Sequence, residues 1–304
     1  MAKHSNRIKK TSGDIVMDVV IYILLTLLAL ICLYPLYQVV VDSFSDPNIV
    51  MKKNGLLFKI EGFQVDAYKM VFSNKNIATG FKNSLFYIVV GTGLQFLTTV
   101  TAAYVLSKKG AMLKKPIMIF FAITMYFGGG LIPSFLLVNK MGLMDTCWAI
   151  LLPGACNVWN IIIMRTQFVN IPDGLKEVAT IDGASDVTIL FRILIPLSGA
   201  VIAVLVLFSA VGYWNMWYEP MIYLTKRSQY PIQSVLREIL IDSNAQMMAG
   251  AGKTQIKLSN TKDPAIQTLV KYANIVVCTI PILVVYPFAQ KYFVKGVMVG
   301  SLKG

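Results

Sequence analysis

Six long uncharged runs constrain the fold of this chain more than any other feature. They lack Asp, Glu, Lys, Arg and His, and they cover residues 19–41, 83–107, 116–139, 146–164, 193–218 and 272–290. A helix of about 20 apolar residues crosses a hydrocarbon core roughly 30 Å thick, so each run is long enough to span a membrane. The sequence therefore predicts an all-α integral membrane protein, a single domain over 1–304. We place its six transmembrane helices at about 15–41, 83–107, 116–139, 146–166, 192–224 and 271–291.

The composition supports this class and excludes others. Hydrophobic residues make up 56% of the chain and charged residues 14%, whereas soluble domains have about 45–50% and about 25%. A soluble globule, a disordered chain and a secreted disulfide scaffold are therefore excluded. The first run is also longer than the core of a signal peptide, which has about 7–15 residues, so we interpret it as a membrane helix.

The chain is poor in residues for catalysis or metal binding. Its single histidine, His4, lies in a basic N-terminal tail. The cysteines have no CxxC spacing and lie in or beside apolar runs, which predicts small packing residues: Cys32, Cys147, Cys156 and Cys278. We therefore expect no catalytic residue, no bound metal and no cofactor in this chain.

The charges of the short connections predict the orientation in the membrane. The N-terminal tail, the 108–115 connection and the C-terminal tail are rich in Lys and Arg, whereas the 140–145 connection holds one Lys and one Asp. Short cytoplasmic connections carry an excess of Lys and Arg. Both termini are therefore predicted to be cytoplasmic. The same loops account for the net charge of +13 without a nucleic-acid partner.

Two long connections, about 42–82 and 219–271, are predicted to lie outside. The second contains "YPIQSVLREIL", whose apolar spacing is typical of a helix. It also contains "GAGKT" at 250–254, which resembles part of a phosphate-binding loop. Because the first glycine and the preceding strand are missing, we do not interpret it as a nucleotide site.

The connection between the fourth and fifth runs, residues 165–196, has helix signals. Pro172 and Asp173 favour a start and Gly183 a stop. Ala179 and Gly183, four residues apart, would share a helix face that a neighbouring surface can approach closely. Two alternatives remain open from spacing alone: a helix that docks on a partner, or an amphipathic helix on the bilayer surface.

The same connection resembles the EAA loop of permease subunits of binding-protein-dependent ABC importers. Glu177, Val178 and Ala179 stand at the EAA position, Gly183 follows at the family spacing, and residues 193–196 read "ILIP". "DGA" at 182–184 matches a common form of the loop. Val178 and Ile195 replace Ala and Leu, which exchanges one apolar residue for another.

The resemblance extends over almost the whole chain. "YPLYQVVVDSF", "GYWNMWYEPMIYL" and "FVKGVMVGSLKG" are similar to the maltose-type permease class. "FGGGLIPSFLLVNKMGLMDT" is similar to the branch linked to oligosaccharides and polysaccharides. The resemblance implies the type I ABC importer permease fold, in the cytoplasmic (inner) membrane of a bacterium.

The resemblance also implies a function and partners. It implies a non-catalytic permease subunit that stands beside a second homologous permease and carries a sugar, with an oligosaccharide as the expected substrate. A cytoplasmic ABC ATPase dimer would bind ATP and Mg, and an extracytoplasmic sugar-binding protein would deliver the substrate. The loop 167–191 would couple to the ATPase, through residues we take to be Leu175, Glu177, Val178, Ala179, Asp182, Gly183, Ala184 and Pro196.

Candidate residues for the sugar path gather near the fourth and fifth runs: Asn157, Asn160, Tyr213, Trp214, Asn215, Trp217 and Glu219. Aromatic faces and amide or carboxyl groups bind sugars. The aromatic residues have an alternative interpretation as an interfacial belt. The asparagines have one as hydrogen bonds between helices. Three glycines at 128–130, followed by Pro133, predict a break in the third span.

Two other functions are also compatible with an apolar chain of this length. One is an ABC permease for another class of solute. The other is a secondary transporter or channel that works without ATP, which is typically marked by inverted repeats or membrane-buried charges. The six runs contain no charge and no clear repeat is visible, so the sequence favours the importer.

Overall fold

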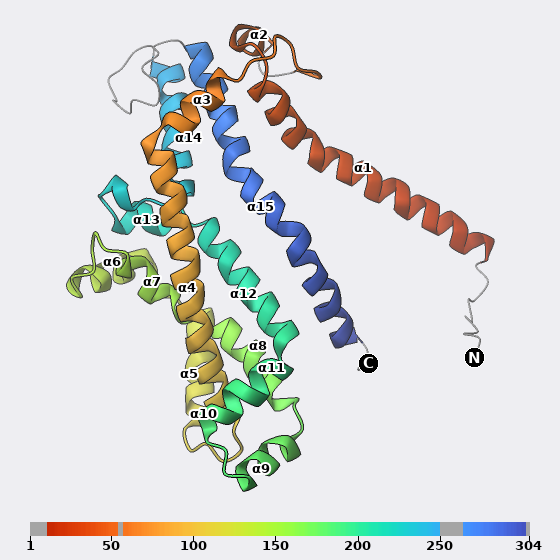
Figure 1. Ribbon diagram of the computed structural model, residues 1–304, viewed down its shortest axis with the longest axis vertical. Coiled ribbons are helices and arrows are strands. Elements are labelled where there is room, and N and C mark those ends of the chain that lie inside the picture. Colours follow the sequence, from red (N-terminus) through yellow and green to blue (C-terminus); the bar gives the residue numbers. More distant parts are fainter. Residues whose placement is uncertain (1–10, 54–56, 250–263, 302–304) are drawn as a thin grey trace. The chain divides into compact units, whose positions relative to one another are not determined.

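The computed structural model describes residues 11–53, 57–249 and 264–301. Side chains are described for this set except 242–249, 264, 288–289 and 291–301. The "GAGKT" segment and His4 lie outside the described residues. The chain forms two compact units: Met1–Val71 with Lys257–Val276, and Phe72–Ile256 with Val277–Gly304. Regular structure in the described ranges is helical, which confirms the all-α prediction (Figure 1).

Among the residues that the structure describes, four helical segments are long and apolar enough to cross a membrane: α1 (Ser12–Ser43), α4 (Lys75–Ser107), Trp148–Val169 and Ala265–Pro287. The third comprises α7 (Trp148–Gly154) and α8 (Val158–Val169), and the fourth lies within α15 (Pro264–Ser301). Two bent helix pairs raise the count to six if each pair is one span. The predicted six apolar regions are thus present as helices, but two of them are not straight.

The first bent pair is α5 (Lys114–Tyr126) and α6 (Leu131–Lys140), which meet at 117°. The break that the glycines predict within the span 116–139 is therefore present. The break at 127–130 contains the three glycines, and Gly130 has a φ of +83°, which is a left-handed conformation that favours glycine. At 1.5 Å per residue the two helices are about 20 Å and 15 Å long, so neither crosses a 30 Å core alone.

The second bent pair joins Asp186–Leu197 to α12 (Gly199–Trp214) at 87°. The first arm consists of α10 (Asp186–Ile189), the π-helix η1 (Leu190–Leu194) and α11 (Ile195–Leu197). The predicted span 192–224 contains this bend at Ser198 and continues past the end of α12. That helix ends at Trp214, where the N–H of Asn215 closes the last turn on the carbonyls of Val211 and Tyr213.

Five further helices lie in the connections: α2 (Pro47–Lys52), α3 (Asp66–Ser73), α9 (Asp173–Ile181), α13 (Tyr218–Tyr223) and α14 (Ile232–Ala249), with a short 3-10 turn η2 (Arg227–Gln229). The predicted helix in "YPIQSVLREIL" is confirmed as the first part of α14. Its backbone begins against α4, where the N–H of Ile232 donates to Ser84 Oγ at 2.9 Å.

In the first unit, the end of α1 packs against the segment that follows it. Asp42, Ser43 and Ser45 are fully buried. The Phe44 ring stacks on Tyr68 of α3, with centroids 4.7 Å apart, and Ser43 Oγ lies 2.7 Å from the Tyr68 hydroxyl. The segment after α1 is therefore held by polar as well as aromatic contacts.

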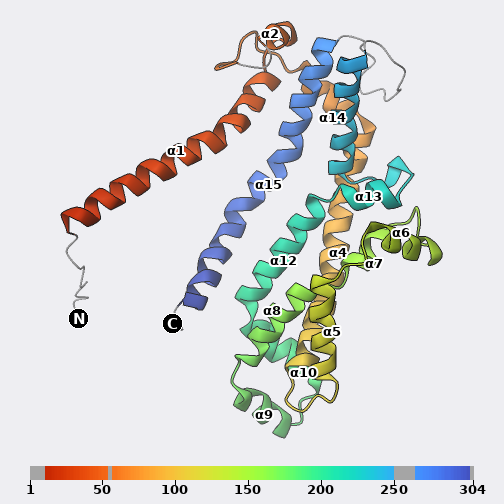
Figure 2. The same ribbon diagram turned by 180° about the vertical axis from the view of Figure 1, so that it is seen from behind.

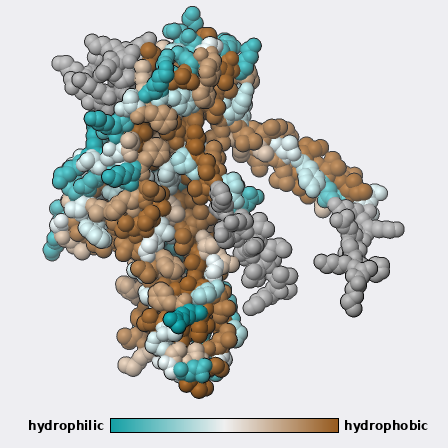
Figure 3. Space-filling view, viewed as in Figure 1, coloured by the Kyte–Doolittle hydropathy of each residue, from teal (hydrophilic) through white to brown (hydrophobic). Residues whose placement is uncertain are grey.

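The apolar body of α1 has no such cover. Its most apolar stretch contains no buried residue, and Figure 3 shows apolar side chains over most of its visible face. A helix that is apolar all round and uncovered needs lipid or another protein as its neighbour.

In the second unit α4 is the central helix, and α8 and α12 pack along it (Figures 1 and 2). Toward the end of α4 they bury an apolar cluster that also takes in η1: Val100, Ala103, Tyr104, Met164, Phe168, Ile171, Ile189, Leu190, Leu194 and Leu205. A second cluster lies nearer the start of α4: Tyr87, Ile150, Leu151, Tyr213, Met216 and Leu224. These two clusters fix the positions of the two candidate sites.

Candidate functional site

The predicted helix in the 167–191 loop is α9, which begins at Asp173 directly after Pro172. It ends in a left-handed turn at Gly183, whose φ is +80°. The N–H of Gly183 donates to the Thr180 carbonyl at 3.1 Å, and that of Ala184 to the Ala179 carbonyl at 2.9 Å. This pair of bonds is a Schellman motif, which satisfies carbonyls at a helix end. The predicted start and stop signals are thus confirmed.

The predicted face shared by Ala179 and Gly183 is wrong. Gly183 lies beyond the helix end, and a Cβ built on it would meet no atom within 4 Å. Ala179 and Ala184 are half-buried and pack against the apolar cluster of α4, α8 and η1. The small residues therefore hold α9 against its own chain, while Gly183 is required by the backbone turn.

The outward face of α9 is apolar. Leu175, Val178 and Ile181 are 48%, 58% and 84% exposed. Their spacing of three residues places them on one side of the helix. Glu177 and Asp182 are exposed beside them. Ile181 was not among the predicted residues. Its position three residues after Val178 is the helical spacing by which it could have been found. Pro196 does not belong to this face, because it lies in α11 beside the bend at Ser198.

Ion pairs fasten the ends of this loop to the two lysines that directly follow α4. Lys109 Nζ lies 2.6 Å from Asp173 Oδ2, at the start of α9. Lys108 Nζ lies 2.6 Å from Asp186 Oδ2, and the Tyr104 hydroxyl donates to Asp186 Oδ1 at 2.7 Å. The hydrogen bond from Lys109, and then that from Lys176, holds the pKa of the Asp173 carboxyl below its usual value. A displacement of α9 therefore pulls directly on the end of α4.

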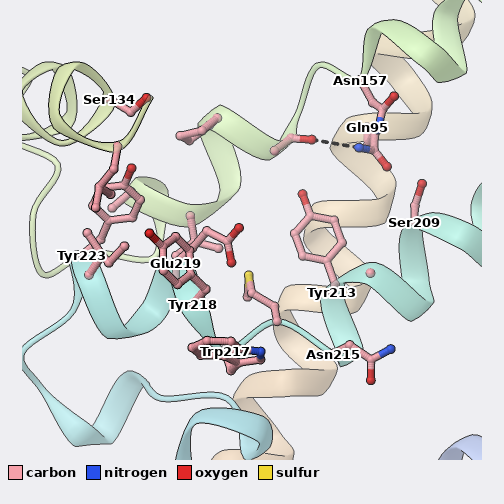
Figure 4. A pocket seen from close by; sticks show the side chains of 18 of the residues that line it. Gln95, Ser134, Asn157, Ser209, Tyr213, Asn215, Trp217, Tyr218, Glu219 and Tyr223 are labelled. Carbon is pink, nitrogen blue, oxygen red and sulfur yellow. Dashed lines mark hydrogen bonds between the residues drawn. The ribbon is translucent and has the colours of Figure 1, made fainter. Parts of the chain in front are cut away.

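A cavity of about 800 Å³ opens in the same unit, between α6, α7, α8, α12 and α13, and reaches Gln95 of α4 (Figure 4). Six of the seven predicted path residues line it: Asn157, Asn160, Tyr213, Asn215, Trp217 and Glu219. Trp214 is not in the lining and packs against Phe81 instead, with ring centroids 6.1 Å apart. Tyr213 and Trp214 are adjacent in α12, yet the first lines the cavity and the second does not.

The wall beside α4 is closely packed around Tyr213. A Cβ built on Gly91 would lie 2.3 Å from the ring's Cζ atom, and one built on Gly154 would lie 2.6 Å from the hydroxyl oxygen. Gln95 Nε2 donates to the Gly154 carbonyl at 3.0 Å, the bond drawn in Figure 4. Both glycines are therefore required by close approach. The ring joins α12 to α4 and α7.

The two asparagines have structural bonds as well as a place in the wall. Asn157 Oδ1 accepts from the N–H of Asn160 at 3.1 Å and caps α8. Asn160 Nδ2 lies 3.4 Å from Ser209 Oγ of α12. The two alternatives for these residues are therefore compatible: they bond within the protein and also line the cavity.

The lining includes groups that the sequence did not single out, among them Gln95, Ser134, Ser209 and Tyr223. Tyr218 meets Trp217 edge to face, with centroids 5.6 Å apart. Among the described lining residues the one charged side chain is Glu219, which begins the first turn of α13. The cavity combines aromatic faces, neutral hydrogen-bonding groups and one carboxylate, a set that suits polyhydroxylated ligands.

Comparison with known proteins gives consistent matches over this architecture. Residues 100–299 match the family described as binding-protein-dependent transport system inner membrane component. The chain is 41% identical over 287 residues to the polygalacturonan/rhamnogalacturonan transport system permease protein YtcP of Bacillus subtilis (strain 168). That match covers 94% of this chain and 98% of YtcP. Protein LplC of the same organism is 39% identical over 297 residues, with 97% of each chain covered.

A solved structure is similar over nearly the whole chain. It is described as a bacterial ABC transporter involved in the import of the acidic polysaccharide alginate. The TM-score is 0.83 at 33% identity, and the match covers 94% of this chain and 100% of that chain. The predicted fold class is confirmed by this likeness.

Proposed function

This chain belongs to the family of inner membrane components of binding-protein-dependent transport systems. From that premise we propose that it is the permease subunit of an ATP-driven importer for oligosaccharides released from an acidic polysaccharide. It is a transport permease, which agrees with the sequence-based prediction. The names of YtcP and of the alginate importer support the substrate class.

The observation that carries the sugar assignment is the 800 Å³ cavity. Its volume lies within the range of about 300–1,000 Å³ that is usual for small-ligand sites. Aromatic rings such as Trp217 and Tyr218 offer faces for the apolar side of a sugar ring. Gln95, Asn215 and Ser134 offer neutral donors and acceptors for its hydroxyl groups.

The coupling function is assigned to α9 within the loop 167–191. Its exposed residues Leu175, Val178 and Ile181 would enter a groove of a cytoplasmic ATPase, with Glu177 and Asp182 beside them. The ATPase, a separate dimer, would bind ATP and Mg and hydrolyse the nucleotide. Its motion would reach the cavity through α4, which has Gln95 in the cavity wall and is followed directly by Lys108 and Lys109. Alternating access then requires two packings of the same helices.

The remaining partners follow from the family. A second permease would stand beside this chain in the bilayer, and an extracytoplasmic binding protein would deliver the sugar. Both termini would lie in the cytoplasm, as the lysines of the short connections predict.

The test is reconstitution of the whole assembly in liposomes, with the binding protein on one side and ATP on the other. We expect ATP-dependent uptake of a labelled rhamnogalacturonan oligosaccharide, which contains both galacturonate and neutral units. Uptake without ATP would identify a secondary transporter. Uptake of an amino acid in place of the sugar would identify a permease for another solute class.

The coupling assignment is tested by Ile181→Asp, which places a charge in the exposed apolar face of α9. We expect less ATPase to copurify with the permease and sugar-stimulated ATP hydrolysis to fall. Ile60→Asp is the matched control, since Ile60 is an exposed apolar residue in the other unit. Equal copurification of ATPase with both variants would contradict the assignment.

A further inference from the structure

Glu219 differs from every other described residue of the cavity lining because it carries a charge. The other lining side chains are aromatic, aliphatic, amide or hydroxyl groups, and none of those described is a Lys, Arg or His. Figure 4 shows the Glu219 carboxylate directed into the open space between Tyr218 and Tyr213. A ligand that enters the cavity therefore meets a negative charge with no described cation in the wall to offset it.

One described cation contacts a residue of the wall without being part of the lining. The guanidinium of Arg237, in α14, stacks on the Trp217 ring with its carbon 3.8 Å from the ring centroid. Arg237 Nη1 also lies 2.5 Å from the sulfur of Met221. Arg237 is not part of the lining, and its guanidinium is engaged with the Trp217 ring. Trp217 itself lines the cavity.

We propose that Glu219 is the specificity-determining residue of this cavity, and that the sugar unit it binds is uncharged. The inference rests on the proposed function and deepens it. An ionised carboxylate has two oxygens that accept hydrogen bonds, so it binds neighbouring hydroxyl groups of one sugar ring. The adjoining Trp217 and Tyr218 rings receive the apolar face of that unit.

The same charge disfavours a uronate at this position. Two like charges about 5 Å apart repel even in a wet site, and more strongly where protein walls lower the effective dielectric constant. A mixed oligosaccharide, with acidic and neutral units, therefore enters with a neutral unit at Glu219. Its carboxylates must be bound by groups outside the described lining of this chain.

The experiment compares two probes of equal length, an oligogalacturonide and a neutral galactose oligosaccharide, in the reconstituted assembly. Glu219→Gln keeps the size and one acceptor oxygen but removes the charge. We expect the preference for the neutral probe, expressed as a ratio of kcat/KM values, to fall about three- to tenfold. Glu219→Asp keeps the charge on a shorter side chain. It should raise the KM for the neutral probe and still reject the acidic one.

Glu238→Gln is the matched control. It makes the same chemical change in α14, where Glu238 pairs with Arg227 and is not part of the lining. We expect its preference to equal that of the wild type. An unchanged preference in Glu219→Gln, with copurification and thermal stability intact, would overturn the inference. Failure of the wild-type assembly to take up either probe or the rhamnogalacturonan oligosaccharide would instead overturn the proposed function, so the two failures are distinguishable.

Discussion

Two glycines of α4 differ in whether they can accept an added Cβ atom. Gly91 faces the Tyr213 ring, whereas Gly93 is exposed and has no atom within 4 Å of its Cβ position. We predict that Gly91→Ala destabilises the protein by about 1–3 kcal/mol, because the added methyl group overlaps a packed ring. Gly93→Ala is the control and should be neutral or stabilising, by up to about 1 kcal/mol, because alanine favours helix.

Thermal unfolding of the two detergent-solubilised variants measures this difference. Equal melting temperatures for Gly91→Ala and Gly93→Ala would contradict the described fit between Tyr213 and Gly91.

Gly183 is constrained by backbone conformation and not by space. Its φ of +80° is costly for residues with a Cβ, and a Cβ there has room. We predict that Gly183→Ala destabilises the end of α9 by about 1–2 kcal/mol, whereas Gly183→Asn costs less, since asparagine tolerates the left-handed region. Hydrogen exchange of the Gly183 region would rank the variants. Identical exchange in the alanine and asparagine variants would show that the turn does not limit this helix end.

At the scale of elements, α9 depends on its ion pair with the end of α4. We predict that Lys109→Ala accelerates amide exchange in the first turn of α9, because Asp173 loses its closest cation. Lys115→Ala removes an exposed lysine from the first turn of α5 and serves as the control. If the two variants exchange alike, the pair between Lys109 and Asp173 does not fasten the helix.

The same pair predicts a response to pH. Hydrogen bonds from Lys109 and then Lys176 lower the pKa of Asp173, and the bond to Asp173 raises the pKa of Lys109. The stabilisation from Asp173 is therefore complete above its ordinary pKa of 3.8 and is lost as the pH falls through the lowered value. That from Lys109 is complete below 10.5 and is lost as the pH rises through the raised value.

A spin label at Leu175 measures this response, and we expect its mobility to be constant near neutral pH and to increase below about pH 4. In Asp173→Asn the label should be mobile at every pH. A label that loosens at neutral pH in the wild type would contradict the assignment to Asp173.

The elements that could be predicted from sequence are those with local signals. Pro172 and Gly183 mark both ends of α9, since one restricts φ before a helix and the other permits the left-handed turn after it. The glycines at 128–130 mark a break. They do not determine the angle between α5 and α6, because that angle depends on what α6 packs against. The bend at Ser198 has a weaker signal, since η1 continues the helical path with altered hydrogen bonds up to Pro196.

The cavity was predictable only in part for a similar reason. The aromatic and amide residues after Tyr213 stand out in an apolar run, but Gln95 and Ser209 are single polar residues in long helices. Which way such residues face is decided by contacts with other helices, such as the bond from Gln95 to Gly154. Trp214 is the opposite case, a residue that was predicted to line the path and does not. An aromatic ring suits a sugar site, but the position of Trp214 on its helix directs it toward Phe81.

For the whole molecule, the testable property is its orientation in the membrane. With the four native cysteines replaced by serine, we predict that Lys109→Cys is shielded from an impermeant thiol reagent in intact cells, while Ser228→Cys is labelled. The reason is the excess of lysine in the short connection that contains Lys109. Both positions are exposed, so access depends on the side of the membrane. Labelling of Lys109→Cys in intact cells would contradict the predicted orientation and place this connection outside.

The fit of the Tyr213 ring against Gly91 and Gly154 also determines how the cavity wall can evolve. A larger residue at either glycine overlaps the ring, so it is accepted only after the tyrosine has become smaller. A smaller residue at 213 leaves a void until the glycines have changed. Both orders pass through a destabilised intermediate, so this wall resists change by single substitutions. Ser134 and Asn215, which are exposed in the lining, have no such constraint. New sugar specificities should therefore arise first by substitution at such open positions, with the Tyr213 contact inherited unchanged.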